Sequence, residues 1–200
     1  VLSQGYFGDR MAQICKAFGL DHDVLECEWG RAVTPGELDR GLKAKNYNVV
    51  VCTHVDTATG ACAPVEEYGQ ILEKTGSLFI VDGVCATGGI PERMDAWGID
   101  VVLTAAQKCL GAPPGLSILV LSELAMEKRR SLPAVSAYYS DLLRWLPIMR
   151  DPSKYFSTPC VNEIRAFAEA TRIILEEGLE ERFERHELYA EALRDGLAAL

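Results

Sequence analysis

The sequence has 200 residues, of which 48% are hydrophobic and 24% are charged, and its formal net charge is −9. A chain of this length can bury an apolar core in one domain, or in one domain and part of a second. The negative charge argues against nucleic acid or an anionic membrane as the main partner, and no apolar run reaches the roughly 18 residues that span a bilayer.

The first quarter of the sequence alternates between helical and strand patterns. Apolar residues at helical spacing predict a helix over 9–19, and a short strand is expected within 22–29. Thr34-Pro35-Gly36-Glu37 has the form of a capping box and predicts a helix that runs to about Ala44. The continuous apolar run over 47–54 predicts a strand that is buried on both faces, as in a parallel sheet covered by helices.

The alternation continues to about residue 130. Three more apolar runs predict strands over 77–82, 100–106 and 116–122. Helical patterns lie near 64–75, near 91–97 and after the capping residue Ser122. This alternation predicts an α/β fold with a mainly parallel sheet.

The last third of the sequence has a different pattern. Residues 131–160 contain four prolines and are expected to be irregular. Two long amphipathic helices are expected over 161–176 and 178–200, with no strand after them. Two such helices after an α/β unit indicate the beginning of a second domain.

Seven cysteines are scattered through the chain, and none forms a C-x-x-C pair. Several lie in apolar runs, as Cys52 does in NVVVCTH. This pattern favours reduced, buried thiols over a disulfide framework or a zinc site. We therefore expect free cysteines within the core and no metal centre.

Three segments with chemically useful side chains follow predicted strands: THVDTATG (53–60), VDGVCATGG (81–89) and TAAQKCLGAPPG (104–115). In open α/β sheets, ligands bind outside the carboxyl ends of the strands. Taken alone, Lys108 is more simply explained as a solvated lysine and Asp82 as the cap of a turn. Their functional alternatives are a Schiff-base amine and the carboxylate partner of a protonated pyridine nitrogen.

Taken together, the three segments resemble the class-V aminotransferases, a branch of the fold-type-I pyridoxal-phosphate enzymes. The sequence is most similar to the alanine–glyoxylate (serine–pyruvate) aminotransferases, above all over VDGVCATGGIPERMDAWGIDVVLTAAQKCLGAPPGLS. The matching features are an aspartate at a strand end, an M-D-x-x-G-I-D approach, and a Q-K pair followed by A-P-P-G. The resemblance covers essentially the whole chain.

The resemblance implies the large-domain fold of these enzymes, a mainly parallel sheet sandwiched by helices. Residues 1–150 would form most of this cofactor-binding domain, and 151–200 a linker and the first helices of the small C-terminal domain. Because members of the family are much longer, the chain is interpreted as a central fragment without their phosphate-binding glycine-rich loop and carboxylate-binding arginine. The enzyme would be cytoplasmic in a prokaryote and peroxisomal or mitochondrial in a eukaryote.

The resemblance also implies roles around the cofactor ring. Lys108 would form the internal aldimine with pyridoxal 5'-phosphate, and Asp82 would pair with the pyridinium nitrogen. Val84 would pack on one face of the ring. Phe7 would stack on the other face, where the family often has tryptophan.

Further roles concern the cofactor's oxygens and phosphate. Thr57 would lie near the phenolic oxygen, and Gln107 would help to hold the phosphate. Tyr155 and Thr158 match a Y-x-x-T element that, in the family, reaches the phosphate of the neighbouring subunit, although the histidines usual within that element are absent. This match implies a homodimer with shared active sites.

The implied activity is a ping-pong transamination through the Lys108 aldimine, between a small amino acid (alanine or serine) and a 2-oxo acid (glyoxylate or pyruvate). One alternative is a catalytically incompetent fragment or pseudoenzyme. Another is a class-V enzyme that acts on aspartate, 2-aminoethylphosphonate or ureidoglycine. A cysteine desulfurase is disfavoured, because Gln107 stands where those enzymes usually have histidine.

Overall fold

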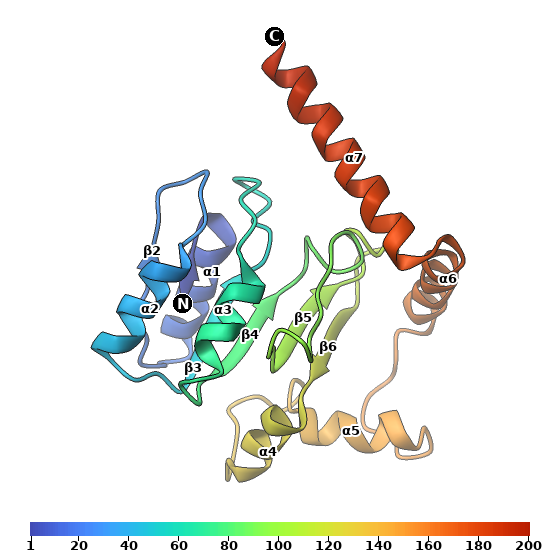
Figure 1. Ribbon diagram of the computed structural model, residues 1–200. Helices are drawn as coiled ribbons and strands as arrows, with labels where there is room; N and C mark the ends of the chain where they lie inside the picture. Colours follow the sequence, from blue (N-terminus) through green and yellow to red (C-terminus); the bar gives the residue numbers. More distant parts are fainter.

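The computed structural model describes all 200 residues and is built around a six-stranded sheet with the order β2-β1-β3-β4-β5-β6 (Figure 1). The strands are β1 (Leu2–Ser3), β2 (Leu25–Glu26), β3 (Val49–Thr53), β4 (Leu78–Asp82), β5 (Val101–Ala105) and β6 (Ser117–Leu121). The helices are α1 (Tyr6–Ala17), α2 (Pro35–Ala44), α3 (Val65–Leu72), α4 (Glu123–Ser131), α5 (Leu142–Arg150), α6 (Val161–Glu177) and α7 (Leu179–Ala198).

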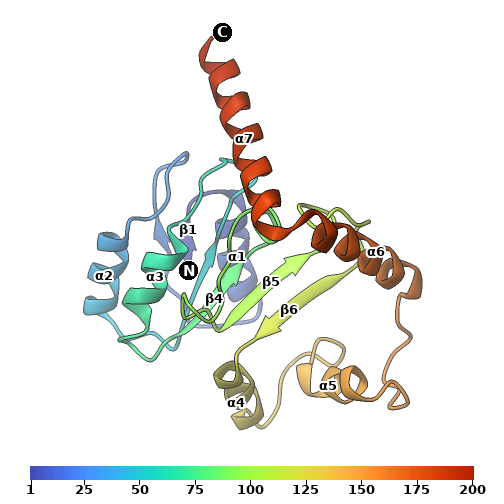
Figure 2. The same cartoon turned by 45° about the vertical axis from the view of Figure 1, so that its right-hand side comes forward.

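The sheet is parallel from β2 to β5, and only β6 runs antiparallel to its neighbour β5. The chain moves outward from β1 to β2, then returns past β1 to β3 and continues to β4. Because such crossovers are right-handed, the reversal puts α1 on one face of the sheet and α2 and α3 on the other (Figure 2). The predicted mainly parallel α/β fold is thus confirmed.

The hydrophobic core lies between the parallel strands and the helices α2 and α3, which cover one face of the sheet. Leu38 of α2, Tyr68 and Leu72 of α3, and Phe79 of β4 belong to one buried cluster, and each is at most 2% exposed. Helix α3 comes so near the segment before β5 that a Cβ on Gly69 would lie 1.8 Å from the Trp97 carbonyl oxygen. Only glycine allows this close approach.

Two helix starts follow the predicted capping chemistry. In α2, the Glu37 N–H donates to the Thr34 hydroxyl at 3.2 Å, and the Thr34 N–H donates to the Glu37 carboxylate at 2.7 Å. In α4, the Ala125 N–H donates to the Ser122 hydroxyl at 3.0 Å. Each side chain therefore satisfies a backbone N–H that has no partner within its helix.

Two elements differ from expectation. The helix predicted near 91–97 is wrong: Pro91 and Gly98 bracket a stretch of turns, and Gly98 has a left-handed φ of +62° that ends it. The expectation that 131–160 is irregular is wrong in part, because the segment contains α5. The Asp141 carboxylate caps α5 by accepting from the Leu143 N–H at 3.1 Å, and Pro147 lies inside the helix.

All seven cysteines are free, as expected, but only Cys52 is fully buried, and Cys62 and Cys160 are exposed. The prediction that the cysteines fill the core is therefore wrong for most of them.

The two predicted C-terminal helices are present, and they meet at Gly178, whose φ of +90° turns the chain between α6 and α7. Figure 1 shows α7 extending away from the sheet, with its C-terminal half clear of the other elements. No helix in the structure is both long and apolar enough to span a bilayer. The domain boundary expected at residue 150 stays a prediction.

Candidate active site

The carboxyl ends of the parallel strands form the edge at which a ligand is expected. The chain reverses direction between β1 and β3, and such a switch point opens a crevice between the loops that leave the two strands. Thr57 lies in the segment after β3, and Lys108 lies in the segment after β5. Asp82 is the last residue of β4 and stands at the start of the segment that follows it. The three segments singled out from the sequence therefore leave the same edge of the sheet.

Asp82 is the last residue of β4, and in the sheet it pairs with Thr53 of β3 and Leu103 of β5. Its side chain is 8% exposed, and one carboxylate oxygen accepts a 3.0 Å hydrogen bond from the Val84 N–H. Burial raises the pKa of the Asp82 carboxyl, and this hydrogen bond only partly offsets the effect. A buried carboxylate with one donor has capacity for a cationic ligand.

Lys108 lies three residues beyond the end of β5, in a turn closed by a 2.9 Å hydrogen bond from the Gly111 N–H to the Lys108 carbonyl. Gly111 has a φ of +74°, a left-handed conformation that glycine adopts without strain. The side chains of Gln107 and Lys108 are exposed, and neither makes a hydrogen bond or ion pair within the chain. The amine is therefore available to a ligand.

The loops after β4 and β5 pack directly against each other. At their bases, the Gly83 N–H donates to the Leu103 carbonyl at 2.8 Å. Farther out, the Cys109 thiol donates to the Cys85 carbonyl at 3.5 Å, and a Cβ on Gly89 would lie 2.6 Å from the Cys109 sulfur. The loop that carries Lys108 therefore adjoins the loop that follows Asp82.

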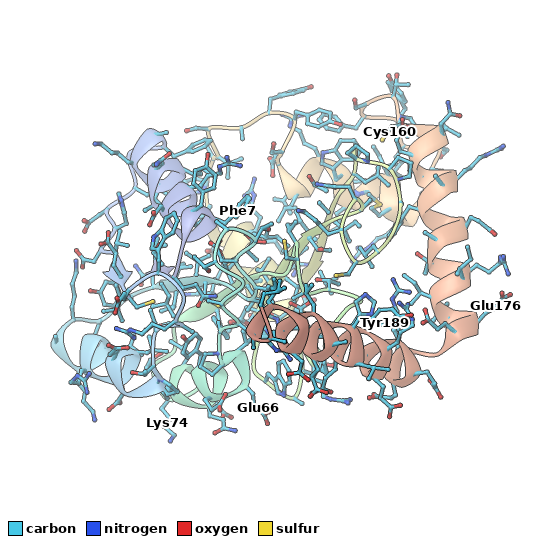
Figure 3. All side chains as sticks on the ribbon, turned by 90° about the horizontal axis from the view of Figure 1, so that it is seen from above. Phe7, Glu66, Lys74, Cys160, Glu176 and Tyr189 are labelled. Atoms are coloured by element: carbon cyan, nitrogen blue, oxygen red, sulfur yellow. The ribbon has the colours of Figure 1, made fainter.

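Phe7 and Thr57 join this edge through Asp56, which is fully buried. One oxygen of its carboxylate accepts from the Phe7 N–H at 2.8 Å, and the other accepts from the Ala58 N–H at 2.8 Å. The Thr57 hydroxyl lies 2.7 Å from the Cys85 sulfur, beside Val84 in the loop after β4. Figure 3, viewed from above, shows Phe7 toward the middle of this face.

Tyr155 and Thr158 lie elsewhere, in the exposed loop between α5 and α6. Their hydroxyl oxygens are 2.9 Å apart, and no hydrogen bond connects either residue to the loops that follow Asp82 or contain Lys108. The structure therefore brings six of the eight predicted residues to one edge and leaves these two apart. Their predicted role at a neighbouring subunit stays a prediction.

A buried ion pair lies at the same end of the sheet, where His54 directly follows β3. One nitrogen of the His54 ring lies 2.8 Å from the Glu92 carboxylate, and the side chains are 4% and 6% exposed. The Thr87 hydroxyl donates to the other Glu92 oxygen at 2.5 Å. Burial alone would lower the pKa of His54, but the Cys62 thiol and the Glu92 carboxylate together raise it to about 9.

Three residues of this edge had not been singled out from the sequence: Asp56, Cys85 and Glu92. Asp56 carried a usable signal, because it follows a buried strand directly and opens the D-T-A-T-G turn. Cys85 and Glu92 carried none, since their partners Thr57 and His54 are distant in sequence. Only the fold brings these pairs together.

The donor set at this edge suits the cofactor that the resemblance implies. Lys108 offers a free amine for an aldehyde, and Asp82 offers a carboxylate for a protonated ring nitrogen. Thr57 supplies a hydroxyl, and Phe7 and Val84 supply apolar side chains. An entering cation would also lower the pKa that burial raises at Asp82. The residues present therefore fit pyridoxal phosphate.

Comparison with known proteins gives the same family. The model of the aminotransferase class-V family matches residues 10–200. The chain is 37% identical over 197 residues to an uncharacterised aminotransferase of Methanocaldococcus jannaschii, and it is 35% identical over 207 residues to alanine–glyoxylate aminotransferase 1 of Saccharomyces cerevisiae. Each match covers 98% of this chain and 51% or 54% of the relative.

A solved structure agrees with this result. Alanine–glyoxylate aminotransferase from Nostoc sp. superposes with a TM-score of 0.92 at 32% identity, over 98% of this chain and 52% of that one. The names of other relatives pair glyoxylate with ureidoglycine, aspartate or serine, and one pairs pyridoxamine with pyruvate.

The chain thus spans about half the length of the curated relatives that it matches. The match nevertheless includes the segments that carry Asp82 and Lys108. The fold is that of the fold-type-I pyridoxal-phosphate transferases over this half. The chain belongs to the aminotransferase class-V family, whose members depend on pyridoxal phosphate.

Proposed function

We propose that this chain forms the cofactor-binding part of an aminotransferase that exchanges an amino group between a small amino acid, alanine or serine, and a 2-oxo acid, glyoxylate or pyruvate. The observation that carries the proposal is the packing of the Lys108 loop on the loop that follows Asp82, through the Cys109 thiol and the Cys85 carbonyl at 3.5 Å. A lysine amine and a buried carboxylate then approach one ring from two sides.

Pyridoxal phosphate, when bound, supplies an aldehyde that condenses with amines and a ring that withdraws electrons from the substrate's α-carbon. The Lys108 amine would hold this aldehyde until the amino donor takes its place. Once free, the same amine would serve as the base that takes the proton from the donor's α-carbon and as the acid that returns it. Lys108 thus acts first as a covalent anchor and then as a proton carrier.

Asp82 would keep a proton on the ring nitrogen, because its buried carboxylate favours a cation beside it. Phe7 and Val84 would pack on the two faces of the ring, and the Thr57 hydroxyl would donate to the phenolic oxygen. Gln107, next to the lysine, supports the phosphate. These residues orient the ring so that the α-carbon bond to be broken lies within reach of Lys108.

The reaction then runs in two halves on one site. The first amino acid leaves as its oxo acid, and the second oxo acid leaves as an amino acid after Lys108 returns the proton in reverse order. Glyoxylate is the best-supported acceptor, because it recurs in the names of relatives whose donors differ. Alanine or serine is the proposed donor, and ureidoglycine and aspartate are the alternatives that the relatives' names support.

The proposal includes a homodimer. Tyr155 and Thr158 lie on an exposed loop of this chain, and Tyr155 is 72% exposed. Two hydroxyls 2.9 Å apart can donate together to one phosphate oxygen. We infer that this pair serves the phosphate of the neighbouring subunit's cofactor, so that each site needs both subunits.

The test uses the whole protein that carries these residues. Pyridoxal phosphate is added, the adduct is reduced with borohydride, and the labelled lysine is mapped by mass spectrometry. Label on Lys108 and its loss in Lys108→Ala are expected, together with loss of nearly all conversion of alanine and glyoxylate to pyruvate and glycine. Lys74→Ala is the matched control, because Lys74 is an exposed lysine distant from Phe7 in Figure 3.

Label on other lysines at equal yield, or undiminished turnover in Lys108→Ala, would refute the assignment. Label on Lys108 without turnover of any of the four donors would identify a pseudoenzyme that retains the cofactor. Repeating the trapping with the 200-residue chain alone then shows whether this part holds the cofactor by itself.

A further inference from the structure

One arginine of the C-terminal helices reaches into the candidate active site. Arg182 lies in the first turn of α7, and its side chain is only 11% exposed. Its Nε donates to the Gly88 carbonyl at 2.7 Å, and its Nη2 donates to the Cys109 carbonyl at 2.5 Å. The remaining Nη1 pairs with Glu177, also at 2.7 Å.

The two carbonyls belong to the two loops that matter for the proposed chemistry. Gly88 lies in the loop that begins after Asp82, and Cys109 is the residue directly after Lys108. They are 94 and 73 residues away from Arg182 in sequence. One guanidinium thus fastens both loops to each other and to α7.

The shape of the side chain suits this task. A guanidinium is planar and directs its N–H groups along fixed, diverging directions, so it can bond to separate acceptors at once. A lysine amine carries its three N–H groups on a single nitrogen, so it cannot bond in the same way to two acceptors that lie apart. Hydrogen bonds from a charged donor are also stronger than neutral ones.

The carboxylate of Glu177, which pairs with Arg182, also keeps its negative charge. The Glu177 carboxylate bonds to Arg185 at 2.5 Å as well as to Arg182. These two bonds lower the pKa of Glu177 to about 2, so the carboxylate stays ionised at working pH. Glu177 therefore orients the Arg182 guanidinium without competing for the N–H groups that face the loops.

We propose that Arg182 is a positioning residue for Lys108, an inference that rests on the proposed function. By holding the carbonyl next to Lys108 and the Gly88 carbonyl in the facing loop, Arg182 sets the path of the lysine backbone relative to Asp82. The C-terminal helices thereby help to define the geometry of a site whose chemistry lies on the sheet.

Arg182→Ala tests the role, and Arg185→Ala is the matched control. Arg185 is on the same helix and pairs with the same Glu177, but it donates to neither loop. Arg182→Lys keeps the charge and loses the divergent donors, and it replaces Arg182→Ala if that variant does not fold. All variants are made in the whole protein.

The first readout is amide hydrogen exchange without cofactor, at Gly111 and Ala112, whose N–H groups bond within the Lys108 loop at 2.9 Å. Exchange at these amides should rise at least about tenfold in Arg182→Ala, because two charge-assisted hydrogen bonds that hold the loop are lost. It should change little in Arg185→Ala. Equal exchange in the two variants would overturn the proposal.

The second readout is the pH midpoint of the absorbance that pyridoxal phosphate acquires on binding. Arg182→Ala and Arg182→Lys should both shift this midpoint, because the lysine amine moves relative to Asp82, and Arg185→Ala should leave it in place. An unchanged midpoint with borohydride label still on Lys108 defeats the role of Arg182 and leaves the proposed function standing. Absence of label in the unmodified protein defeats the proposed function itself, whatever the exchange rates are.

Discussion

The Asp56 carboxylate and the backbone N–H of Phe7 are joined by a 2.8 Å hydrogen bond that ties the loop after β3 to the first turn of α1. The two segments follow the strands on either side of the switch point, so this bond joins them beside the place where a ligand is expected. A Cβ on Gly5 would lie 2.7 Å from the same carboxylate, which keeps the entry into α1 free of side chains. Asp56 thus fixes one wall of the site.

Replacing Asp56 with alanine should destabilise the fold and displace Phe7. The Phe7 and Ala58 N–H groups would lose an acceptor that is itself fully buried, at a cost of about 2 kcal/mol in the free energy of unfolding. Urea unfolding measures this change. Asp21→Ala is the control: Asp21 is exposed and without hydrogen bonds, so a change within about 0.5 kcal/mol is expected. Equal effects in both variants would contradict the assigned role.

The His54–Glu92 pair predicts how stability depends on pH. The pKa of His54 in the folded protein is about 9, above its ordinary value of 6.5. The stabilisation is therefore complete below about pH 6.5 and is lost as the pH rises through about 9, with an amplitude on the order of 3 kcal/mol. Unfolding free energies at pH 6, 7.5 and 9 measure it.

Glu92→Gln should remove most of this pH dependence, because the amide is isosteric but carries no charge. His22→Gln is the control, since His22 is a partly exposed histidine that bonds only to the backbone of Leu20. A stability profile that is flat between pH 6 and 9 in the unmodified protein would show that His54 is not charged in the fold.

Asp82 predicts a conflict between stability and function. Because burial raises its carboxyl pKa, the ionised group destabilises the fold at neutral pH when no cation faces it. Asp82→Asn should therefore raise the free energy of unfolding of the cofactor-free protein by about 1 kcal/mol, and it should weaken pyridoxal phosphate binding at the same time.

Asp100→Asn is the control for Asp82→Asn, and it should change stability in the opposite direction. Its carboxylate accepts from the Phe79 N–H at 2.9 Å and from the Ser122 hydroxyl at 2.8 Å. This substitution should lower the free energy of unfolding by about 1 kcal/mol, because the amide can place an N–H against a donor. If both variants lower stability equally and both bind the cofactor normally, Asp82 is an ordinary structural residue.

Cysteine labelling tests the position of the site without any turnover. Cys85 is partly exposed and lies beside Val84, with its sulfur 2.7 Å from the Thr57 hydroxyl. Bound pyridoxal phosphate should slow its alkylation by iodoacetamide at least about tenfold, because the ring would cover this part of the crevice. Cys62 is an exposed internal control whose rate should not change, and equal slowing of both thiols would count against the assigned site.

Much of this structure follows from local signals in the sequence. The capping box at Thr34 and the cap at Ser122 were predictable because each depends on residues three positions apart. The buried strand before His54 was predictable from its continuous apolar run. The segments that carry Asp82 and Lys108 were placed at one edge by the rule that parallel strands end on the same side.

The rest depends on contacts between distant parts of the chain. Helix α5 escaped prediction because Pro147 normally argues against a helix interior, and here the Asp141 cap and an ion pair of Asp141 with Arg129 at 2.6 Å hold it. Arg182 lies in a run of alternating charges that is typical of a solvated helix face. Nothing in that run indicates that its guanidinium meets Gly88.

Lys108 and Asp82 are held in place by different kinds of strand pairing. Lys108 follows β5, which pairs antiparallel with β6, whereas Asp82 ends β4, which pairs parallel with β3 and β5. Ala105 and Ser117 face each other across the two strands, so the segment that bears the lysine begins and ends at neighbouring points. Closing such a short loop costs little chain entropy, whereas bringing β4 beside β3 requires a whole helical crossover. The segment that bears the lysine is therefore fixed at both ends by neighbouring strands that lie close together in the sequence, whereas Asp82 depends on strands that a whole helix separates.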